Sequence, residues 1–120
     1  MRGIIAAGTH IPHYRLDRTE VAAFFGKGGG RGQRSVASFD EDTTTMGVAA
    51  ARRALAATDL EPQALWFASA SPAYLEKTNA TAVHAALQLS PEVGALDFGG
   101  ALRSGAGALR TACLLYTSPS

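Results

Sequence analysis

The sequence is almost without cysteine: Cys113 is the single thiol in 120 residues. One cysteine excludes an internal disulfide framework and any zinc site built from several cysteines. A chain with so few thiols is typical of a reducing compartment. We therefore expect a cytoplasmic protein.

Neither sign of charge dominates the chain. Eleven Lys and Arg residues stand against ten Asp and Glu residues, for a net charge of +1. A dedicated nucleic-acid binder normally carries a strong basic excess, so we expect no nucleic-acid partner. No apolar run approaches the roughly 20 residues that span a bilayer, and the first residues do not resemble a signal peptide. We expect no membrane partner either.

Short apolar runs alternate with helical patterns along the chain. Strands are predicted at residues 3–8, 65–70 and 93–98, and helices at 18–25, 43–57, 79–89 and 101–112. Such alternation is typical of an α/β fold in which helices cover a mostly parallel sheet. The alanines at 49–51, 54 and 56 leave little side-chain bulk, so helix 43–57 can lie close to a neighbour.

The predicted helix at 18–25 has clear signals at both ends. Asp17 is a good N-cap residue, and Gly26 is a good helix stop. The spacing predicts that Val21, Ala22 and Phe25 share a buried face. In helix 79–89 the same spacing argument places Val83, Ala86 and Leu87 on one face.

Residues 26–32 contain five glycines and form a predicted loop. Their spacing matches neither a P-loop nor a dinucleotide-binding turn, since Lys27 is followed by glycine and no strand precedes the loop. A flexible surface loop is one interpretation. The other is a basic rim, made of Lys27, Arg31 and Arg34, that contacts a phosphorylated ligand.

Other residues could carry chemistry by their type alone. His10 and His13 lack nearby partners for a metal site, His84 suits a structural role on its helix, and we expect no metal. Asp40 and Asp42 could pair as acid and base, although favourable charge at a helix N-terminus explains them as well. The remaining nucleophile candidates are Ser69, Ser71, Ser104 and Cys113, and none of the serines lies in a Gly-x-Ser-x-Gly motif.

The last eight residues break the small-residue pattern that precedes them. The segment 113–120 resembles read-through into adapter or vector sequence, so we expect it to be a non-native tail. Residues 1–112 would then be the genuine part of the chain.

Several segments, taken together and in order, resemble the 3-hydroxy-3-methylglutaryl-CoA synthase family of the thiolase superfamily, in its archaeal and actinobacterial type. The matching stretches are Gly3-Ile4-Ile5, Ile11-Pro12-His13-Tyr14-Arg15, Asp40-Glu41-Asp42-Thr43, Ala49-Ala50-Ala51-Arg52, Trp66-Phe67-Ala68-Ser69-Ala70-Ser71, Lys77-Thr78 and Ala95-Leu96-Asp97-Phe98. The resemblance covers residues 1–112, and family members are about three times longer. It implies a thiolase-like fold, present here as an incomplete N-terminal half.

The resemblance also implies a reaction and the positions that carry it. In the family, a cysteine at the start of a buried helix takes an acyl group from acetyl-CoA, and a glutamate after a strand acts as acid and base. This sequence has Leu102 at the cysteine position and Ala70 at the glutamate position. Neither side chain can do that chemistry. Cys113 lies 11 residues beyond Leu102, about three helical turns further on, so it is no substitute.

Three functions remain open at this point. The first is a piece of an acyl-CoA-binding or condensing protein that lacks acyl-enzyme chemistry. The second is an active condensing or cleaving enzyme that uses residues from the other half, so whether the protein is an enzyme stays open. The third is a small α/β binding module. The resemblance implies a coenzyme A thioester as substrate or ligand, no tightly bound cofactor, contacts of Lys27, Arg31 and Arg34 with CoA phosphates, and a homodimer or partner subunit.

Overall fold

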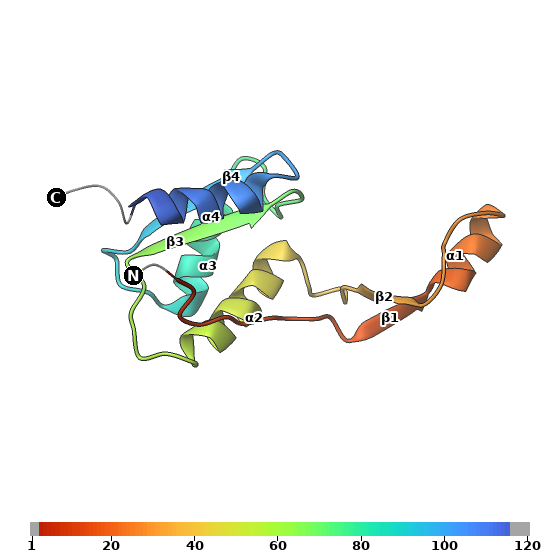
Figure 1. Cartoon of the computed structure of the whole chain (residues 1–120), viewed down its shortest axis with the longest axis horizontal. Helices are drawn as coiled ribbons and strands as arrows, with labels where there is room; N and C mark the ends of the chain where they lie inside the picture. Colours follow the sequence, from red (N-terminus) through yellow and green to blue (C-terminus); the bar gives the residue numbers. More distant parts are fainter. Residues whose placement is uncertain (1–2, 116–120) are drawn as a thin grey trace. The chain divides into compact units, whose positions relative to one another are not determined.

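The structure is a computed structural model that describes residues 3–115 (Figure 1). Its elements are β1 (Tyr14–Asp17), α1 (Arg18–Phe25), β2 (Gln33–Val36), α2 (Thr43–Leu55), β3 (Ala64–Ser69), α3 (Asn79–Leu87), β4 (Gly94–Gly99) and α4 (Ser104–Leu115). The chain divides into two compact units. Unit 2 is Ile11–Asp42, and unit 1 is the rest of the described chain.

Unit 1 is built on two parallel strands. β3 pairs with β4 in a register that runs from Ala64 opposite Gly94 to Ser69 opposite Gly99. Helix α3 packs on one face of this sheet and against α2, while α4 packs on both strands from the other face (Figure 1). The predicted arrangement of helices around a parallel sheet is thus confirmed for these strands.

The core of unit 1 is small. Among the described residues, only Ala80 and Val83 are apolar and fully buried, at 0% and 2% exposure. Leu87, half-buried, continues the same stripe four residues after Val83. Val83 and Leu87, two of the three residues predicted to share a face of this helix, thus lie on the buried stripe. Ala86, the third, is exposed.

Residues 3–8 do not form the predicted buried strand. Ile4 and Ile5 are 81% and 74% exposed, and the segment has no strand partner. It runs instead beside α2, where the backbone of Gly8 lies against the carbonyl oxygen of Ala50 and Arg53 donates a hydrogen bond to the carbonyl of Thr9. An extended apolar run becomes a strand only when another strand pairs with it, and sequence pattern cannot show whether that partner is in place.

The helices of unit 1 differ from prediction at their ends. α2 ends at Leu55, two residues early, with Arg52 and Arg53 in its last turn as predicted. α3 ends at Leu87, because Gln88 takes a left-handed conformation with φ of 54°. α4 begins at Ser104 and not at 101, because the Ser104 N–H and hydroxyl both bond to the carbonyl of Ala101 and close a turn there.

Unit 2 is a helix between two antiparallel strands. β1 pairs with β2 from Tyr14 opposite Val36 to Asp17 opposite Gln33, a pairing that the sequence analysis did not predict. Helix α1 is confirmed at its predicted bounds, with Asp17 as N-cap and a left-handed Gly26 as C-cap. Hydrogen bonds from the backbone and hydroxyl of Thr19 lower the pKa of Asp17.

The buried face predicted for α1 is only partly present. Val21 and Ala22 are half-buried. Phe25 is 69% exposed and packs edge-on against Phe24 at a ring distance of 4.9 Å, so its predicted burial is wrong. In the loop that follows α1, position 29 requires glycine. Its φ is 78°, and a side chain there would overlap the carbonyl oxygen of Arg18.

The end of α4 reaches into the predicted tail. The helix includes residues 113–115, and residues 116–120 lie outside the described part of the chain. No helix within residues 3–115 has the length and apolar character needed to cross a membrane.

Candidate functional site

The segments that follow β3 and β4 meet at one edge of the sheet. Because the strands are parallel and Ser69 lies opposite Gly99, residues 70–78 and 100–103 both leave the sheet at its carboxyl end. We call these two segments the carboxyl rim. In open α/β sheets, ligands bind outside this end of the strands. The rim contains both positions that the family resemblance singled out, Ala70 and Leu102.

Leu102 lies in the turn between β4 and α4. Gly100, with φ of 83°, begins the turn, and the bonds to the carbonyl of Ala101 close it. The Leu102 side chain is 96% exposed. A thiol in this place, just before the N-terminus of a helix, would have a lowered pKa, but leucine has no nucleophilic atom.

Ala70 is the first residue after β3, and hydroxyl groups fix the chain around it. The Ser69 hydroxyl accepts a hydrogen bond from the Ser71 N–H at 3.1 Å, and the Thr43 hydroxyl donates to the Ser71 carbonyl at 3.0 Å. The Ala70 side chain is exposed. Its position is therefore held in place, although its methyl group cannot transfer a proton.

One buried amide ties the rest of segment 70–78 to its surroundings. The Asn79 side chain, 2% exposed, accepts hydrogen bonds from the Tyr74 N–H at 3.0 Å and the Thr44 hydroxyl at 3.3 Å. It donates to the Tyr74 carbonyl and to the Asp97 carboxylate, both at 3.0 Å. Asp97 also accepts the backbone N–H groups of Asn79 at 2.7 Å and Ala80 at 2.6 Å. We call this set the Asn79–Asp97 network.

The network keeps the Asp97 carboxylate charged. Partial burial raises the pKa of this carboxyl, but the hydrogen bonds from the Asn79 side chain and from the backbone of Asn79 and Ala80 lower it by more. The pKa of Asp97 therefore lies below its usual value. A carboxylate that accepts the first N–H groups of a helix also has a favourable interaction with the helix dipole.

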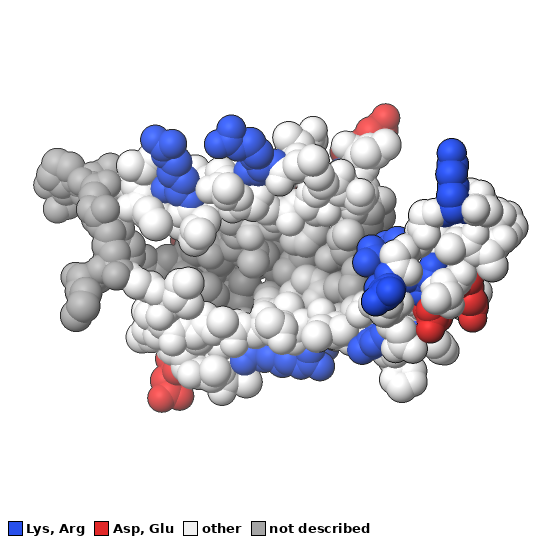
Figure 2. Space-filling model, turned by 45° about the vertical axis from the view of Figure 1, so that its right-hand side comes forward, with Lys and Arg blue, Asp and Glu red and all other residues white. Residues whose placement is uncertain are grey.

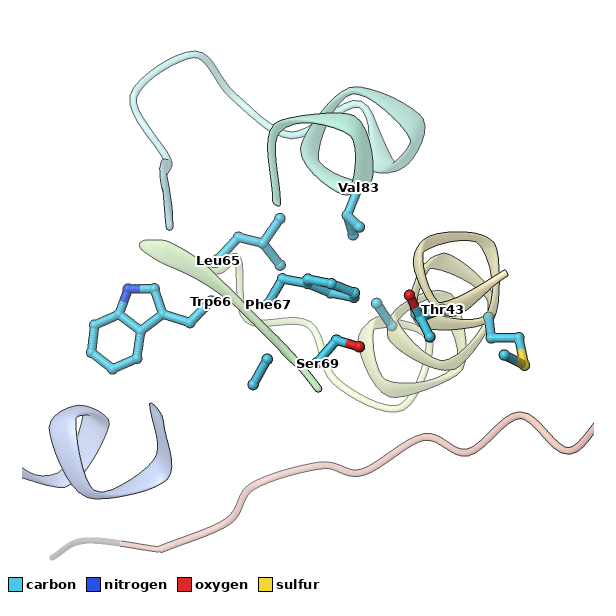
Figure 3. Close-up of a pocket in the computed structure, with 10 residues that line it drawn as sticks. Thr43, Leu65, Trp66, Phe67, Ser69 and Val83 are labelled. Carbon is cyan, nitrogen blue, oxygen red and sulfur yellow. The ribbon is translucent and has the colours of Figure 1, made fainter. Parts of the chain in front are cut away.

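A groove of about 400 Å³ lies between β3, α2 and α3. In Figure 3 the side chains of Leu65 and Phe67 point from β3 toward the side on which Val83 lies, and the Trp66 indole points the opposite way. Ser69 and Thr43 line the end of the groove that is nearest the carboxyl rim. The groove is mostly apolar, so it suits packing better than binding of a polar ligand.

The predicted basic residues all lie in unit 2, where Lys and Arg side chains are frequent on the surface (Figure 2). Lys27 and Arg31 belong to the glycine loop, and Arg34 belongs to β2, opposite Leu16. All three side chains are exposed. Arg15, on the neighbouring strand, is engaged instead with backbone carbonyls, among them that of Tyr14 at 2.9 Å.

The histidines have local or structural contacts. His13 stacks edge-on against Tyr14 at 5.6 Å, and His84 lies 3.0 Å from the carbonyl of Ser90. His10 and His13 fall in different units. Residues 3–115 contain no group of three or more His, Cys, Asp or Glu side chains that could hold a metal ion.

The remaining nucleophile candidates are dispersed. The Ser104 hydroxyl closes the turn before α4, and Cys113 is exposed near the end of that helix. Asp40 accepts a hydrogen bond from the Ser38 hydroxyl, which lowers its pKa.

The Asn79–Asp97 network was missed by the sequence reasoning, although a signal was there. Asp97 is a lone charge inside the apolar run 95–98, and Asn79 begins a helix whose other residues, except His84, are small or apolar. A charged residue in a strand requires a partner, and a helix N-terminus is the partner that suits a carboxylate.

Curated relatives match nearly the whole chain. The hydroxymethylglutaryl-CoA synthase of Methanosphaera stadtmanae is 38% identical over an alignment that covers 98% of this chain and 37% of that protein. The one from Thermococcus sibiricus is 36% identical over 92% of this chain and 33% of its own length. The chain is homologous to hydroxymethylglutaryl-CoA synthases. It spans about a third of the length of these synthases, and no family model matches it.

Solved structures show that the fold is thiolase-like. A β-ketoacyl-[acyl carrier protein] synthase III (FabH) from Thermus thermophilus superposes with a TM-score of 0.82 at 23% identity, over 95% of this chain and 38% of that one. A Xanthomonas campestris OleA superposes with a TM-score of 0.83 at 19% identity, over 93% of this chain. The expected fold class and the resemblance to the synthases are thus confirmed.

Proposed function

We propose that this chain is the N-terminal part of a hydroxymethylglutaryl-CoA synthase-like protein that binds an acyl-CoA but does not form an acyl-enzyme. The observation that carries the proposal is the carboxyl rim. At this rim the family resemblance places a nucleophile and an acid–base group, and the side chains there are those of Leu102 and Ala70. The coverage of about a third of each synthase supports the view that the rest of the protein lies beyond these residues.

The ligand in this proposal is a coenzyme A thioester, as the names of the homologous synthases suggest. Lys27, Arg31 and Arg34 are the residues proposed to contact its phosphates, because they are exposed cations in or close to a glycine-rich loop whose backbone can approach a ligand closely. Residues 113–120 remain a proposed non-native tail, and a homodimer or a partner subunit remains the proposed assembly, in the cytoplasm.

The decisive experiment separates binding from acylation. The chain is mixed with acetyl-CoA labelled in the acetyl group, binding is measured by calorimetry, and covalent label is measured after denaturation. We expect saturable binding and no covalent label. Stable label on a peptide from the carboxyl rim would overturn the proposal, and so would an absence of binding by both this chain and the full-length protein.

The phosphate contacts have their own test. Arg34→Glu reverses a charge on β2 of unit 2, and Arg110→Glu is the matched control because Arg110 is an exposed residue on α4 of unit 1. We expect the Arg34 variant to raise the dissociation constant for CoA about tenfold or more, and the Arg110 variant to leave it unchanged. Equal effects of the two reversals would indicate general charge attraction and no phosphate site.

A further inference from the structure

The carboxyl rim contains one long segment that has no strand or helix of its own. Residues 70–78 run from the end of β3 to the start of α3, and most of their side chains are exposed. A loop of this kind has many conformations available, and holding one of them costs conformational entropy. A site at the rim therefore requires contacts that select one conformation.

The contacts that do so converge on Asn79. Its side chain bonds both the N–H and the carbonyl of Tyr74, in the middle of the segment, at 3.0 Å each. The same amide reaches Thr44 on α2 and Asp97 on β4. A single buried side chain thus joins the loop to a helix and to the neighbouring strand.

Asp97 fixes the orientation of that amide. Its carboxylate accepts hydrogen bonds from Nδ2 of Asn79 and from the backbone N–H groups of Asn79 and Ala80. The amide nitrogen therefore faces β4, and the amide oxygen accepts hydrogen bonds from the Tyr74 N–H and the Thr44 hydroxyl. Asp97 is two residues before Gly99, the last residue of β4, and five residues before Leu102. The network therefore connects residues 70–78 to β4, the strand that leads into residues 100–103.

We propose that Asn79 and Asp97 are positioning residues of the acyl-CoA site, which together hold the segment that begins at Ala70 against the end of β4. This inference rests on the proposed function for its ligand, but not for the mechanical link between the two residues and the loop. Neither residue acts on substrate; each acts through residues 70–78.

The test uses the full chain and two readouts. Amide hydrogen exchange, resolved by peptide, compares residues 70–78 with β3 and β4, and calorimetry with acetyl-CoA follows binding. The variants are Asn79→Asp, which places two carboxylates 3.0 Å apart, Asp97→Asn, which removes the charge, and the double variant, which exchanges the amide and the carboxylate. Thr81→Ala is the matched control, because the Thr81 hydroxyl bonds only the exposed carbonyl of Thr78.

We expect each single variant to increase exchange in residues 70–78 at least tenfold more than it increases exchange in β3 and β4, and the double variant to recover part of the protection of the loop. The single variants should also weaken acetyl-CoA binding, by threefold or more, at a temperature where they are fully folded. The double variant is the control for folding, since it again pairs an amide with a carboxylate and can therefore hold residues 70–78 in place.

Three results would overturn the inference. Unchanged exchange in residues 70–78 would show that the network does not hold the loop. An equal rise in exchange across β3 and β4 would show that the network only stabilises the whole unit. A looser loop with unchanged binding would show that the loop does not shape the site. If the unmodified protein does not bind acetyl-CoA at all, the proposed function fails, and the assignment of Asn79 and Asp97 to an acyl-CoA site fails with it. The exchange results would still show whether these two residues hold residues 70–78 in place.

Discussion

Replacing Asn79 with alanine should destabilise unit 1 more than any other single truncation of a polar side chain in its sheet and helices. The substitution removes four side-chain hydrogen bonds of 3.3 Å or shorter, two of them to the backbone of Tyr74 and one each to Thr44 and Asp97. It also removes a weaker one of 3.5 Å to the carbonyl of Lys77. A typical protein hydrogen bond contributes about 0.5–1.5 kcal/mol net. Four bonds set an upper range of about 2–6 kcal/mol on that scale.

The exposure of the partners lowers this figure. Tyr74 and Asp97 are both exposed residues, so water can replace part of what the amide supplied. Thr44 is 6% exposed, so water cannot readily replace the hydrogen bond that its hydroxyl loses, and this loss keeps its full cost. We therefore expect a loss of about 2–4 kcal/mol in the free energy of unfolding, or roughly 10 °C in Tm for a chain of this size.

The assay is urea unfolding followed by fluorescence of Trp66, the single tryptophan, which lies on β3 with its ring 5.5 Å from that of Phe98. Thr81→Ala, at the same end of α3, should change the free energy of unfolding by no more than about 0.5 kcal/mol. A loss below about 1 kcal/mol for Asn79→Ala would mean that water satisfies these groups as well as the amide does, and the reasoning from hydrogen bonds would be refuted.

Three further outcomes follow from particular residues. Because the pKa of Asp97 is lowered in the folded chain, the ionised carboxylate stabilises the fold fully above about pH 3.9, and this stabilisation is lost as the pH falls through the pKa of the folded state. Asp97→Asn should remove that part of the acid sensitivity. An unchanged acid unfolding curve would contradict the stabilising role of this carboxylate. Gly8→Ala would place a methyl group on the carbonyl oxygen of Ala50, so it should cost about 1–3 kcal/mol and make residues 3–10 easier to cleave in limited proteolysis. Gly105→Ala, which meets no atom within 4 Å on α4, should instead raise the Tm, since alanine is favoured over glycine in a helix by about 1 kcal/mol; a lower Tm would show that the turn before α4 needs that glycine.

Sequence pattern was sufficient for the elements whose signals are local. Helix α1 matches its prediction because Asp17 and Gly26 mark its ends by backbone chemistry that depends on few neighbours. The order of helices and strands in unit 1 could be predicted for the same reason. The strand at residues 3–8 could not, because an extended segment becomes a strand only through a partner that is distant in the sequence.

In the candidate site, too, some features could be expected from the sequence and others could not. The assignment of Leu102 and Ala70 to the site comes from the family resemblance alone, and the structure brings both residues to one edge of the sheet. The pairing of Asn79 with Asp97 joins residues 18 positions apart through geometry that only the folded sheet creates. A charge within an apolar strand indicates that some partner exists, but it does not indicate which one.

The sheet of unit 1 also has a consequence for handling the protein. In a sheet of two strands, each strand has one side without a neighbour, and β3 and β4 are six residues long with mostly apolar side chains. Leu96 on β4 is 57% exposed. Open, apolar strand edges of this kind template the addition of further strands from other molecules. We therefore expect this chain on its own to aggregate as its concentration rises, and to need charged or proline substitutions at those edges, or the remaining strands of a longer protein, to remain monomeric.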